Sequence, residues 1–595
     1  MNINRIGTPM TALIFLFLLA ACAVEELEGS LPLPNGKTAS SDAPPSEPPA
    51  SSEPSVSAGS LSFINDEFEA NRFLTRSGWG GSKADIEALV NSDAEDWVAM
   101  EFQKSPTFTL PDVLALPMAS NGELPKHQAT YLYWDHIATA DDELRQRMAF
   151  ALSQIFVYSD VGSVGRQERR AYFQDILIRN AFGNYRDLLE EISYSPAMAV
   201  WLTYWRNRKG DEQTGRMPDE NYAREILQLF SIGVVELNMD GTPKLDSQGR
   251  QIETYSNVDI IGLAKVFTGL SSKGESFWDA DSDADYHALV MFEDRHSPLE
   301  KTFLGATIAP GTPGNESIQR ALDTIFEHPN VAPFIARQLI QRFTASSPSP
   351  DYVERVALAF ETGKFIGPNG TEFGTFERGD LSATLAAVLL DKSLFAENAA
   401  QHHSHSPGKI REPILRFMHW VNAFEVQNID SENEYRLVST ADPVQGLGQQ
   451  PFRAPSVFNF YRPGYIAPGT RSGVEGLTAP ELQLLDDSSS IGYFNFMTDF
   501  AFDRSSQRNS DARTYVADYS DELLLVDDLP ELVQHLNNLL TGGRMPAEER
   551  ESVVYVLEAL PMDDRTPERW QSDRLEIVQT AVSLVMNSPS FAVVW

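Results

Sequence analysis

One stretch of the sequence, PDENYAREILQLFSIG from residue 218 to 233, combines acidic, basic and amide side chains at helical spacing. Glu220 and Arg224 are four residues apart, as are Asn221 and Glu225, so both pairs can meet on a helix surface. Carboxylates held rigidly over a cleft can do acid–base chemistry or bind a ligand. The same spacing also suits a helix whose polar face carries ordinary surface ion pairs. A catalytic and a structural interpretation of these residues therefore both stay open.

The helix that would position these side chains has its own start and stop signals. Pro218 cannot continue a helix from upstream, and Asp219 can accept hydrogen bonds from the free N–H groups of the first turn. Gly233 stands where helices commonly end in a left-handed residue. We expect a helix over residues 219–232 with a buried apolar stripe: Tyr222, Ala223, Ile226, Leu227, Leu229 and Phe230.

Histidines are the natural partners for such carboxylates. His287 and His296 flank the segment FEDR, so that the two imidazoles and its acids could form a carboxylate–histidine site. A hydrolase would combine Glu220, Arg224 and Glu225 with His296 or His287. The alternative is a polar loop whose histidines do no chemistry.

Two other clusters contain candidate metal ligands. His402, His403 and His405 lie together, but in a loop flanked by Ser, Pro and Gly. Asp281 and Asp283 belong to an alternating acidic run that starts like a calcium loop. That run carries Ala and Val where such a loop requires Gly and Glu, so a solvated acidic loop fits it better. We expect no tightly bound zinc and no other cofactor, while a loosely bound calcium ion stays open.

The segment GLGQQPFRAPSVFNFYRPGY, residues 446–465, is a long loop rich in Pro, Gly and aromatic residues. Its rings must either pack into the core or line a groove. Arg453, Phe458, Tyr461 and Arg462 could stack on sugar rings or bind a carboxylate, and they form the best binding surface that the sequence offers.

Several enzyme classes lack their signatures in this sequence. It contains no nucleophile-elbow G-x-S-x-G, no H-E-x-x-H, no P-loop and no dinucleotide fingerprint. Its single cysteine, Cys22, argues against cysteine catalysis and cysteine-based metal sites.

Residues 1–21 read as a signal peptide, with Arg5 before an apolar run that is too short to span a bilayer. The run ends in Leu-Ala-Ala-Cys, which resembles the bacterial lipobox, so we expect Cys22 to be lipidated. Residues 22–59 are rich in Ser and Pro and predict a disordered tether. Ala23 and Val24 carry no retention signal for the inner membrane, which favours the outer membrane, on its periplasmic or surface face.

The net charge of −37 makes the chain strongly acidic. Such a charge repels nucleic acid, so we expect no nucleic-acid partner. It keeps an exported protein soluble and could favour cationic partners.

Helical periodicity dominates residues 60–595 and predicts a mainly α, irregular multi-helical domain. Residues 234–255 predict a small β-hairpin, and Ser256 with Asp259 predicts a capping box at the start of the next helix. A Ser/Pro-rich break at 346–350 suggests two lobes, 60–345 and 346–595.

Seven stretches together resemble the bacterial family filed as domain of unknown function 1800. They are NRFLTRSGWGGSKADIEAL, PDENYAREILQLFSIGVVELNMDGTPKLDSQG, YSNVDIIGLAKVFTGL, KTFLGATI, REPILRF, LGQQPFRAPSVFNFYRPGY and APELQLLDDSSSIGYFNFM. The family motif matches Asp219, Glu220, Asn221, Ala223, Arg224 and Glu225 in full. A His-Asp pair of the family is His296-Ser297 here, which puts the role of that pair in doubt.

The resemblance implies a helical exported protein that often accompanies a second exported family related to sulfatases and phosphatases. It implies no specific activity. The leading hypothesis is a lipid-anchored binding or accessory module that works with such a sulfatase-like partner or with an extracellular polysaccharide. The alternative is a hydrolase built on the Glu/Arg/His cluster, and a purely structural envelope protein is a third hypothesis.

Overall fold

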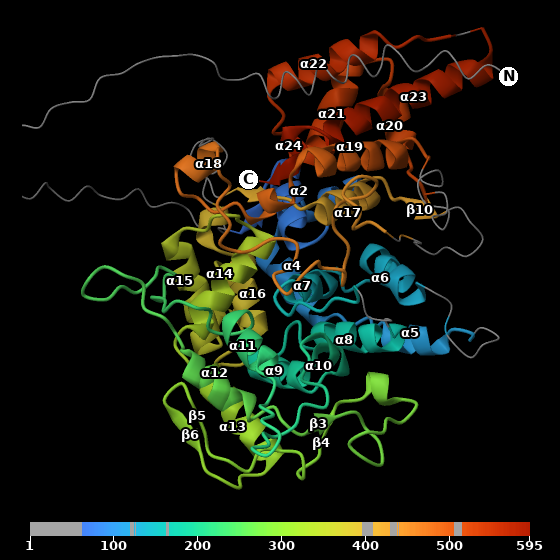
Figure 1. The fold of residues 1–595 in the computed structure, drawn as a ribbon. Coiled ribbons are helices and arrows are strands. Elements are labelled where there is room, and N and C mark those ends of the chain that lie inside the picture. The colour runs from blue at the N-terminus through green and yellow to red at the C-terminus, as the bar shows by residue number, and fades with distance from the viewer. Residues whose placement is uncertain are drawn as a thin grey trace, which may run out of the picture. The chain divides into compact units, whose positions relative to one another are not determined.

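The computed structural model describes residues 62–118, 124, 127–161, 166–395, 408–428, 437, 439–504, 515–563 and 565–594. The predicted signal peptide, Cys22, the tether and the histidines His402, His403 and His405 lie outside the described residues. Residues 59–595 group into one compact unit, in which helices dominate (Figure 1). The predicted mainly α, irregular multi-helical fold is confirmed.

The first part of this unit is a run of short helices joined by tight turns. They are α2 (Glu67–Ser77), α3 (Lys83–Leu89), α4 (Ala94–Gln103), α5 (Leu110–Ala115), α6 (Gln128–Thr139), α7 (Glu143–Ser153), α8 (Gln167–Arg179), α9 (Tyr185–Ser193) and α10 (Pro196–Trp201). Helix α2 begins directly after Asp66. Asp66 accepts a hydrogen bond from Glu69 N and starts the helix there, while Phe63–Ile64 pairs as a strand with Ser92–Asp93.

The middle part carries the helix expected from the polar motif. Its helices are α11 (Asn221–Gln228), α12 (Asn257–Ala264), α13 (Gly314–Phe326), α14 (Val331–Phe343), α15 (Pro350–Thr362) and α16 (Leu381–Leu389). The predicted capping box is present at α12, where the Asp259 carboxylate accepts from both the backbone N–H and the hydroxyl of Ser256.

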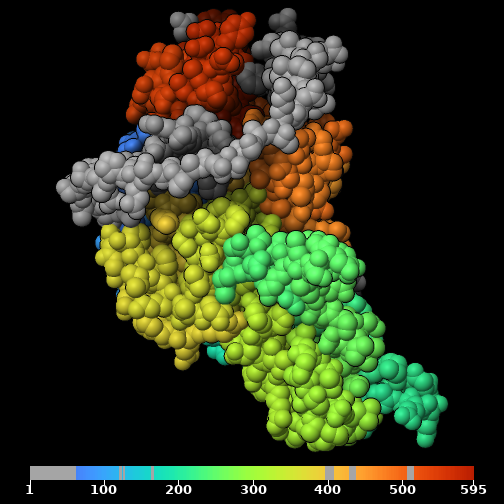
Figure 2. All heavy atoms as spheres, turned by 90° about the vertical axis from the view of Figure 1, so that its left-hand side faces the viewer, coloured from blue at the N-terminus to red at the C-terminus, as the bar shows by residue number. Residues whose placement is uncertain are grey.

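The C-terminal part contains α17 (Pro413–Ala423), α18 (Arg471–Val474), α19 (Asp487–Ala501), α20 (Ser520–Leu525), α21 (Leu529–Thr541), α22 (Ala547–Glu558), α23 (Pro567–Met586) and α24 (Pro589–Ala592). Helix α2 packs against α21, so the two ends of the unit touch. Helices α21–α23 lie at the opposite end from α12, α13 and β3–β6 (Figures 1 and 2). Among the described residues, no helix is both long and apolar enough to cross a membrane.

The strands are short and form antiparallel pairs. They are β1 (Phe63–Ile64) with β2 (Ser92–Asp93), β3 (Leu270–Ser271) with β4 (Val290–Met291), β5 (Lys301–Phe303) with β6 (Ala306–Ile308), β7 (Phe365–Ile366) with β8 (Glu372–Phe373), β9 (Lys409–Ile410) with β12 (Val593–Val594), and β10 (Gln427–Asn428) with β11 (Tyr515–Val516). Short 3₁₀ turns cover Ala284–Tyr286, Lys392–Leu394 and Pro480–Leu484.

The predicted β-hairpin at residues 234–255 is a unit of three extended segments. Isolated bridges join Val235 to Glu253, Leu237 to Pro243, and Leu245 to Gln251, so each segment pairs with both others. The two turns fall at Gly241 and Gly249, both with positive φ. A hairpin with two long strands would leave the middle segment unpaired.

The core lies where α7 and α14 meet. Helix α7 is buried on all sides from Leu144 to Leu152, including two arginines, and α14 packs against α7, α15 and α16. Helix α14 ends at Phe343 and α15 begins at Pro350, so the Ser/Pro-rich segment does break the helical pattern. The division into two lobes at this segment stays a prediction.

Candidate functional site

Helix α11 is held at its first turn by hydrogen bonds around Asp219. The Oδ1 atom of Asp219 accepts a hydrogen bond from Asn221 N at 2.8 Å, and its Oδ2 atom accepts one from the Thr203 hydroxyl at 3.0 Å. The Asn207 side chain binds the Asp219 backbone on both sides, accepting from its N–H at 2.9 Å and donating to its C=O at 3.3 Å. The helix thus begins at Asn221, two residues later than predicted, with Glu220 as its N-cap residue. Asp219 lies one residue before the N-cap and accepts one free N–H group of the first turn, and Asn207 fixes the incoming chain.

The end of α11 differs from the sequence prediction. The helix stops at Gln228, and residues 229–232 continue in irregular turns before Gly233, whose φ is +68°. The N–H of Gly233 still donates to the C=O of Leu227 at 2.9 Å. A Cβ atom at Gly233 would lie 2.8 Å from the Phe334 ring, so both φ and packing require glycine here.

The polar row of α11 is divided between solvent and core. Glu220 and Arg224 approach to 3.5 Å and keep 36% and 42% of their side chains exposed. Asn221 is half-buried. Glu225, by contrast, is buried, and its Oε2 has no hydrogen-bond partner among the described residues. Burial raises the pKa of Glu225, while Arg224 opposes that shift.

His296 is buried on a neighbouring segment. Its Nδ1–H donates to the C=O of Thr268 at 2.8 Å, and within the described part of the chain Nε2 has no hydrogen-bond partner. Burial lowers the pKa of His296, and the nearby Lys301 lowers it further, so the neutral imidazole is favoured. Asn207 links this region to α11, because its C=O accepts from the N–H of Gly269, the residue after Thr268. No hydrogen bond joins His296 to Glu220, Arg224 or Glu225.

His287 and the acidic run are occupied by local contacts. His287 Nδ1 donates to the C=O of Asp283 at 2.8 Å. Lys273 Nζ lies 2.8 Å from Asp283 and 3.9 Å from Asp281. Across the residues that the structure describes, no three His, Cys, Asp or Glu side chains gather as a metal site.

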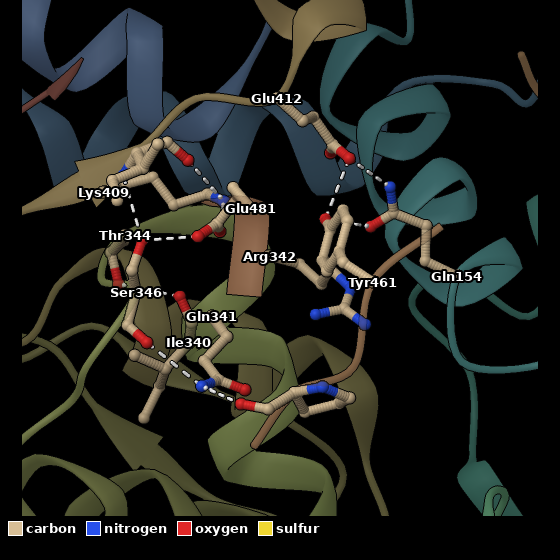
Figure 3. A network of polar contacts seen from close by, with 12 residues as sticks. Gln154, Ile340, Gln341, Arg342, Thr344, Ser346, Lys409, Glu412, Tyr461 and Glu481 are labelled. Carbon is tan, nitrogen blue, oxygen red and sulfur yellow. Dashed lines mark hydrogen bonds and ion pairs between the residues drawn. The ribbon is translucent and has the colours of Figure 1, made fainter. Parts of the chain in front are cut away.

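The aromatic loop of residues 446–465 is anchored in the core by Glu412, just before α17. Oε2 of Glu412 accepts hydrogen bonds from the Tyr461 hydroxyl and from Gln154 Nε2, both at 2.8 Å (Figure 3). It also accepts a hydrogen bond from Gln449 Nε2. Tyr461 is 1% exposed, and the guanidinium of Arg342 lies 5.1 Å from its ring centroid. Tyr461 therefore belongs to the core and not to a binding surface.

A second buried pair lies beside Glu412. Lys409 and Glu481 form an ion pair in which both side chains are 1% exposed. The other carboxylate oxygen of Glu481 accepts from the Ser346 hydroxyl at 2.8 Å (Figure 3). A small cavity of about 20 Å³, room for one water molecule, lies next to Gln154 and Gln449. The buried contacts of Glu412 and of Glu481 thus position the aromatic loop, but the cavity beside them has no space for a substrate.

The remaining binding candidates of the loop face outward. Phe458 is 37% exposed, and the guanidinium of the exposed Arg462 lies 4.7 Å from its ring centroid. Arg453 is paired with Asp160 at 3.4 Å. Of the residues predicted to bind, Phe458 and Arg462 are thus brought together at the surface.

Sequence reasoning did not single out two other features. One is the buried Glu412–Tyr461 centre, whose residues come from REPILRF and from the aromatic loop. The other is a surface group at Trp205 and Trp278, both substantially exposed. The run WRNRK at 205–209, rich in cations for so acidic a chain, was the available signal.

The comparisons with known proteins agree with the sequence resemblance. A model of the family described as "Protein of unknown function (DUF1800)" matches residues 72–593. No curated protein and no solved structure matches the chain. The match takes in α11, His296, Glu412 and the aromatic loop, and it spans most of the sequence. The chain therefore belongs to this family of proteins of unknown function.

Proposed function

We propose that this protein is an exported, lipid-anchored binding module of the bacterial envelope that holds an extracellular polymer or a sulfatase-like partner enzyme. The observation that carries the proposal is the stack of Phe458 and Arg462 at the surface. The loop beneath it is fixed by the buried Glu412–Tyr461 contact. A rigid ring beside a guanidinium needs little ordering on binding, so it can contribute affinity efficiently.

The placement of the acidic residues supports a binder more than a hydrolase. A hydrolase built on this cluster would bring its carboxylates and a histidine within reach of one substrate. Glu220 lies in a half-exposed ion pair, Glu225 points into the protein, and His296 is bonded to the backbone of Thr268. These groups therefore do not form one set around a shared cleft.

A comparison of variants tests the proposal. Tagged full-length protein and a Phe458→Ala/Arg462→Ala variant are used to capture proteins and glycans from the native envelope. We expect the variant to lose the specific co-purifying species. The matched control is Phe376→Ala/Lys364→Ala, which removes a similar stack, 4.5 Å from ammonium to ring centroid, elsewhere on the surface. Identical captures by the wild-type protein and the Phe458→Ala/Arg462→Ala variant would refute the proposed surface.

One observation favours a hydrolase as the second candidate. Glu225 is a buried carboxyl group with a raised pKa and an unpartnered oxygen, which is typical of a general acid. In a hydrolase, Glu225→Gln would abolish turnover of a glycoside or ester substrate while the protein stays folded. In a binding module, the same variant keeps full binding and gains stability at neutral pH.

A further inference from the structure

A group of four side chains from two loops lies at the surface. One loop joins α10 to α11, and the other follows β3. Trp205 and Trp278 are 37% and 49% exposed. The guanidinium of Arg206 lies 4.3 Å from the ring centroid of Trp205 and 5.8 Å from that of Trp278, and the guanidinium of Arg208 lies 5.2 Å from the Trp278 ring. We call these four side chains the tryptophan–arginine platform.

The platform is held by the backbone around it. Trp205 Nε1 donates to the Ser272 hydroxyl at 2.9 Å, and the Arg206 N–H donates to the C=O of Leu270 at 3.0 Å. The Arg206 guanidinium also donates to the C=O of Trp278. Arg206 has a φ of +61°, an uncommon conformation that these contacts maintain. The indole of Trp205 is therefore held by its own hydrogen bond, and the backbone of Trp278 is tied to Arg206.

Among the described residues, no carboxylate forms an ion pair with the arginines of the platform. Arg206 donates to main-chain oxygens, and within the described residues Arg208 and the adjacent Lys209 take part in no ion pair. This stands out in a chain with 84 acidic and 47 basic residues. Guanidinium groups without a carboxylate are matched to carboxylate, sulfate or phosphate groups of a ligand.

We propose that the tryptophan–arginine platform binds an acidic polysaccharide. Sugar rings would lie on the exposed indole faces, and their acid groups would pair with Arg208 and Lys209. The inference rests on the proposed binding function and adds a second binding surface, with its ligand class. A protein interface normally buries about 800 Å² on each partner around an apolar core. Two indoles among charged residues offer no such core, whereas a glycan strand needs only a stacking ring and a charged contact.

Direct titration with defined polymers tests this inference. Polygalacturonate supplies carboxylates, dextran sulfate supplies sulfates, and dextran is the neutral reference. We expect the full-length protein to bind at least one acidic polymer at least about ten-fold more tightly than dextran. Trp278→Ala and Arg208→Gln should each weaken that binding by about ten-fold or more, because aromatic and arginine anchors dominate such contacts.

The chain offers a matched control for the stack. Trp570 is 40% exposed and lies 4.5 Å from the guanidinium of Arg574 on α23, so Trp570→Ala removes a similar indole elsewhere and should leave binding unchanged. Equal affinity for dextran, or full binding of an acidic polymer by both Trp278→Ala and Arg208→Gln, would overturn the inference. So would loss of a co-purifying protein from these variants without loss of polymer binding.

These results separate the inference from the proposed function. If the wild-type protein binds none of the three polymers but still captures its specific species through Phe458 and Arg462, the platform assignment fails and the binding function stands. If both measurements are negative, both fail.

Discussion

The hydroxyl group of Tyr461 donates a 2.8 Å hydrogen bond to Oε2 of Glu412, and both side chains are 1% exposed. The contact joins the start of α17 to the aromatic loop, which are 49 residues apart in sequence. Burial and the nearby carboxylate raise the pKa of Tyr461 well above its usual range, so the phenol stays a donor at every physiological pH.

Removing that hydroxyl should destabilise the protein measurably. Tyr461→Phe leaves the ring in place but removes one of the donors to a buried carboxylate, at a cost of about 1–3 kcal/mol in the free energy of unfolding. Urea denaturation measures the change. Tyr465→Phe, four residues on, is the control and should change the free energy of unfolding by about 0.5 kcal/mol or less. Equal urea midpoints for Tyr461→Phe and the wild-type protein would contradict the role of Glu412 as the anchor.

The buried pair of Lys409 and Glu481 predicts a larger effect. Lys409→Met leaves the Glu481 carboxylate buried and without its cation, which costs about 3–5 kcal/mol. The double variant Lys409→Met/Glu481→Leu should recover much of that loss, because it removes the orphaned charge as well.

An exposed pair provides the control for that experiment. Arg471 and Glu475 lie 3.0 Å apart with 88% and 48% of their side chains exposed. Breaking this pair with Arg471→Ala should cost about 0–1 kcal/mol. A Lys409→Met variant as stable as Arg471→Ala would show that Lys409 and Glu481 do not depend on each other.

Asp175 predicts a pH dependence of stability. Its carboxylate accepts from the N–H groups of Thr109 and Leu110 at the start of α5, but burial outweighs them and raises its pKa to about 7. The unfolded chain releases this proton near pH 4. Protonation of Asp175 therefore makes its full contribution to the free energy of unfolding below about pH 4. That contribution is lost as the pH rises to about 7.

The Asp175→Asn variant isolates this contribution. A shift of about three pKa units corresponds to about 4 kcal/mol, so the variant should lose far less stability than the wild-type protein between pH 4 and pH 8. Unfolding free energies at several pH values give the comparison. Asp187→Asn, at an exposed position on α9, should keep the wild-type pH profile. If Asp175→Asn kept the wild-type dependence of unfolding free energy on pH, Asp175 would not be its source.

Lipidation at Cys22 is the fourth prediction. Cys22→Ser should leave the protein unlipidated and mostly absent from the membrane fraction, because the chain has no second cysteine to carry the lipid. Mass spectrometry of the mature N-terminus tests for the lipid, and an unmodified Cys22 in the mature chain would contradict the predicted lipidation.

Local signals in the sequence predicted the parts of the fold that depend on local contacts. Asp219 accepts a hydrogen bond from the N–H of Asn221 at the start of α11, and Ser256 with Asp259 forms the capping box of α12. Both interactions span three residues or fewer, so the local sequence predicts them. The apolar stripe of α11 is buried at Tyr222, Ile226 and Leu227 for the same reason.

Contacts between distant segments were beyond this reasoning. A tyrosine in a loop can face either water or the core. Tyr461 is buried because its hydroxyl bonds to Glu412, a residue that is distant in sequence. The equal spacing of Glu220 with Arg224 and of Asn221 with Glu225 suggested one polar row, yet packing buries Glu225 and exposes Arg224. Trp205 and Trp278 share Arg206 only because the chain returns to the same surface through β3.

Asn207 connects the segment that carries the platform to the start of α11. Its side chain is bonded to both backbone groups of Asp219 at the start of α11, and its C=O is bonded to Gly269 beside β3. Trp205 lies two residues from Asn207, so a force applied to Trp205 would reach the family motif through the two hydrogen bonds between Asn207 and Asp219. A polymer under tension at the platform would pull on α11 directly, and hydrogen exchange at its first turn would register that force.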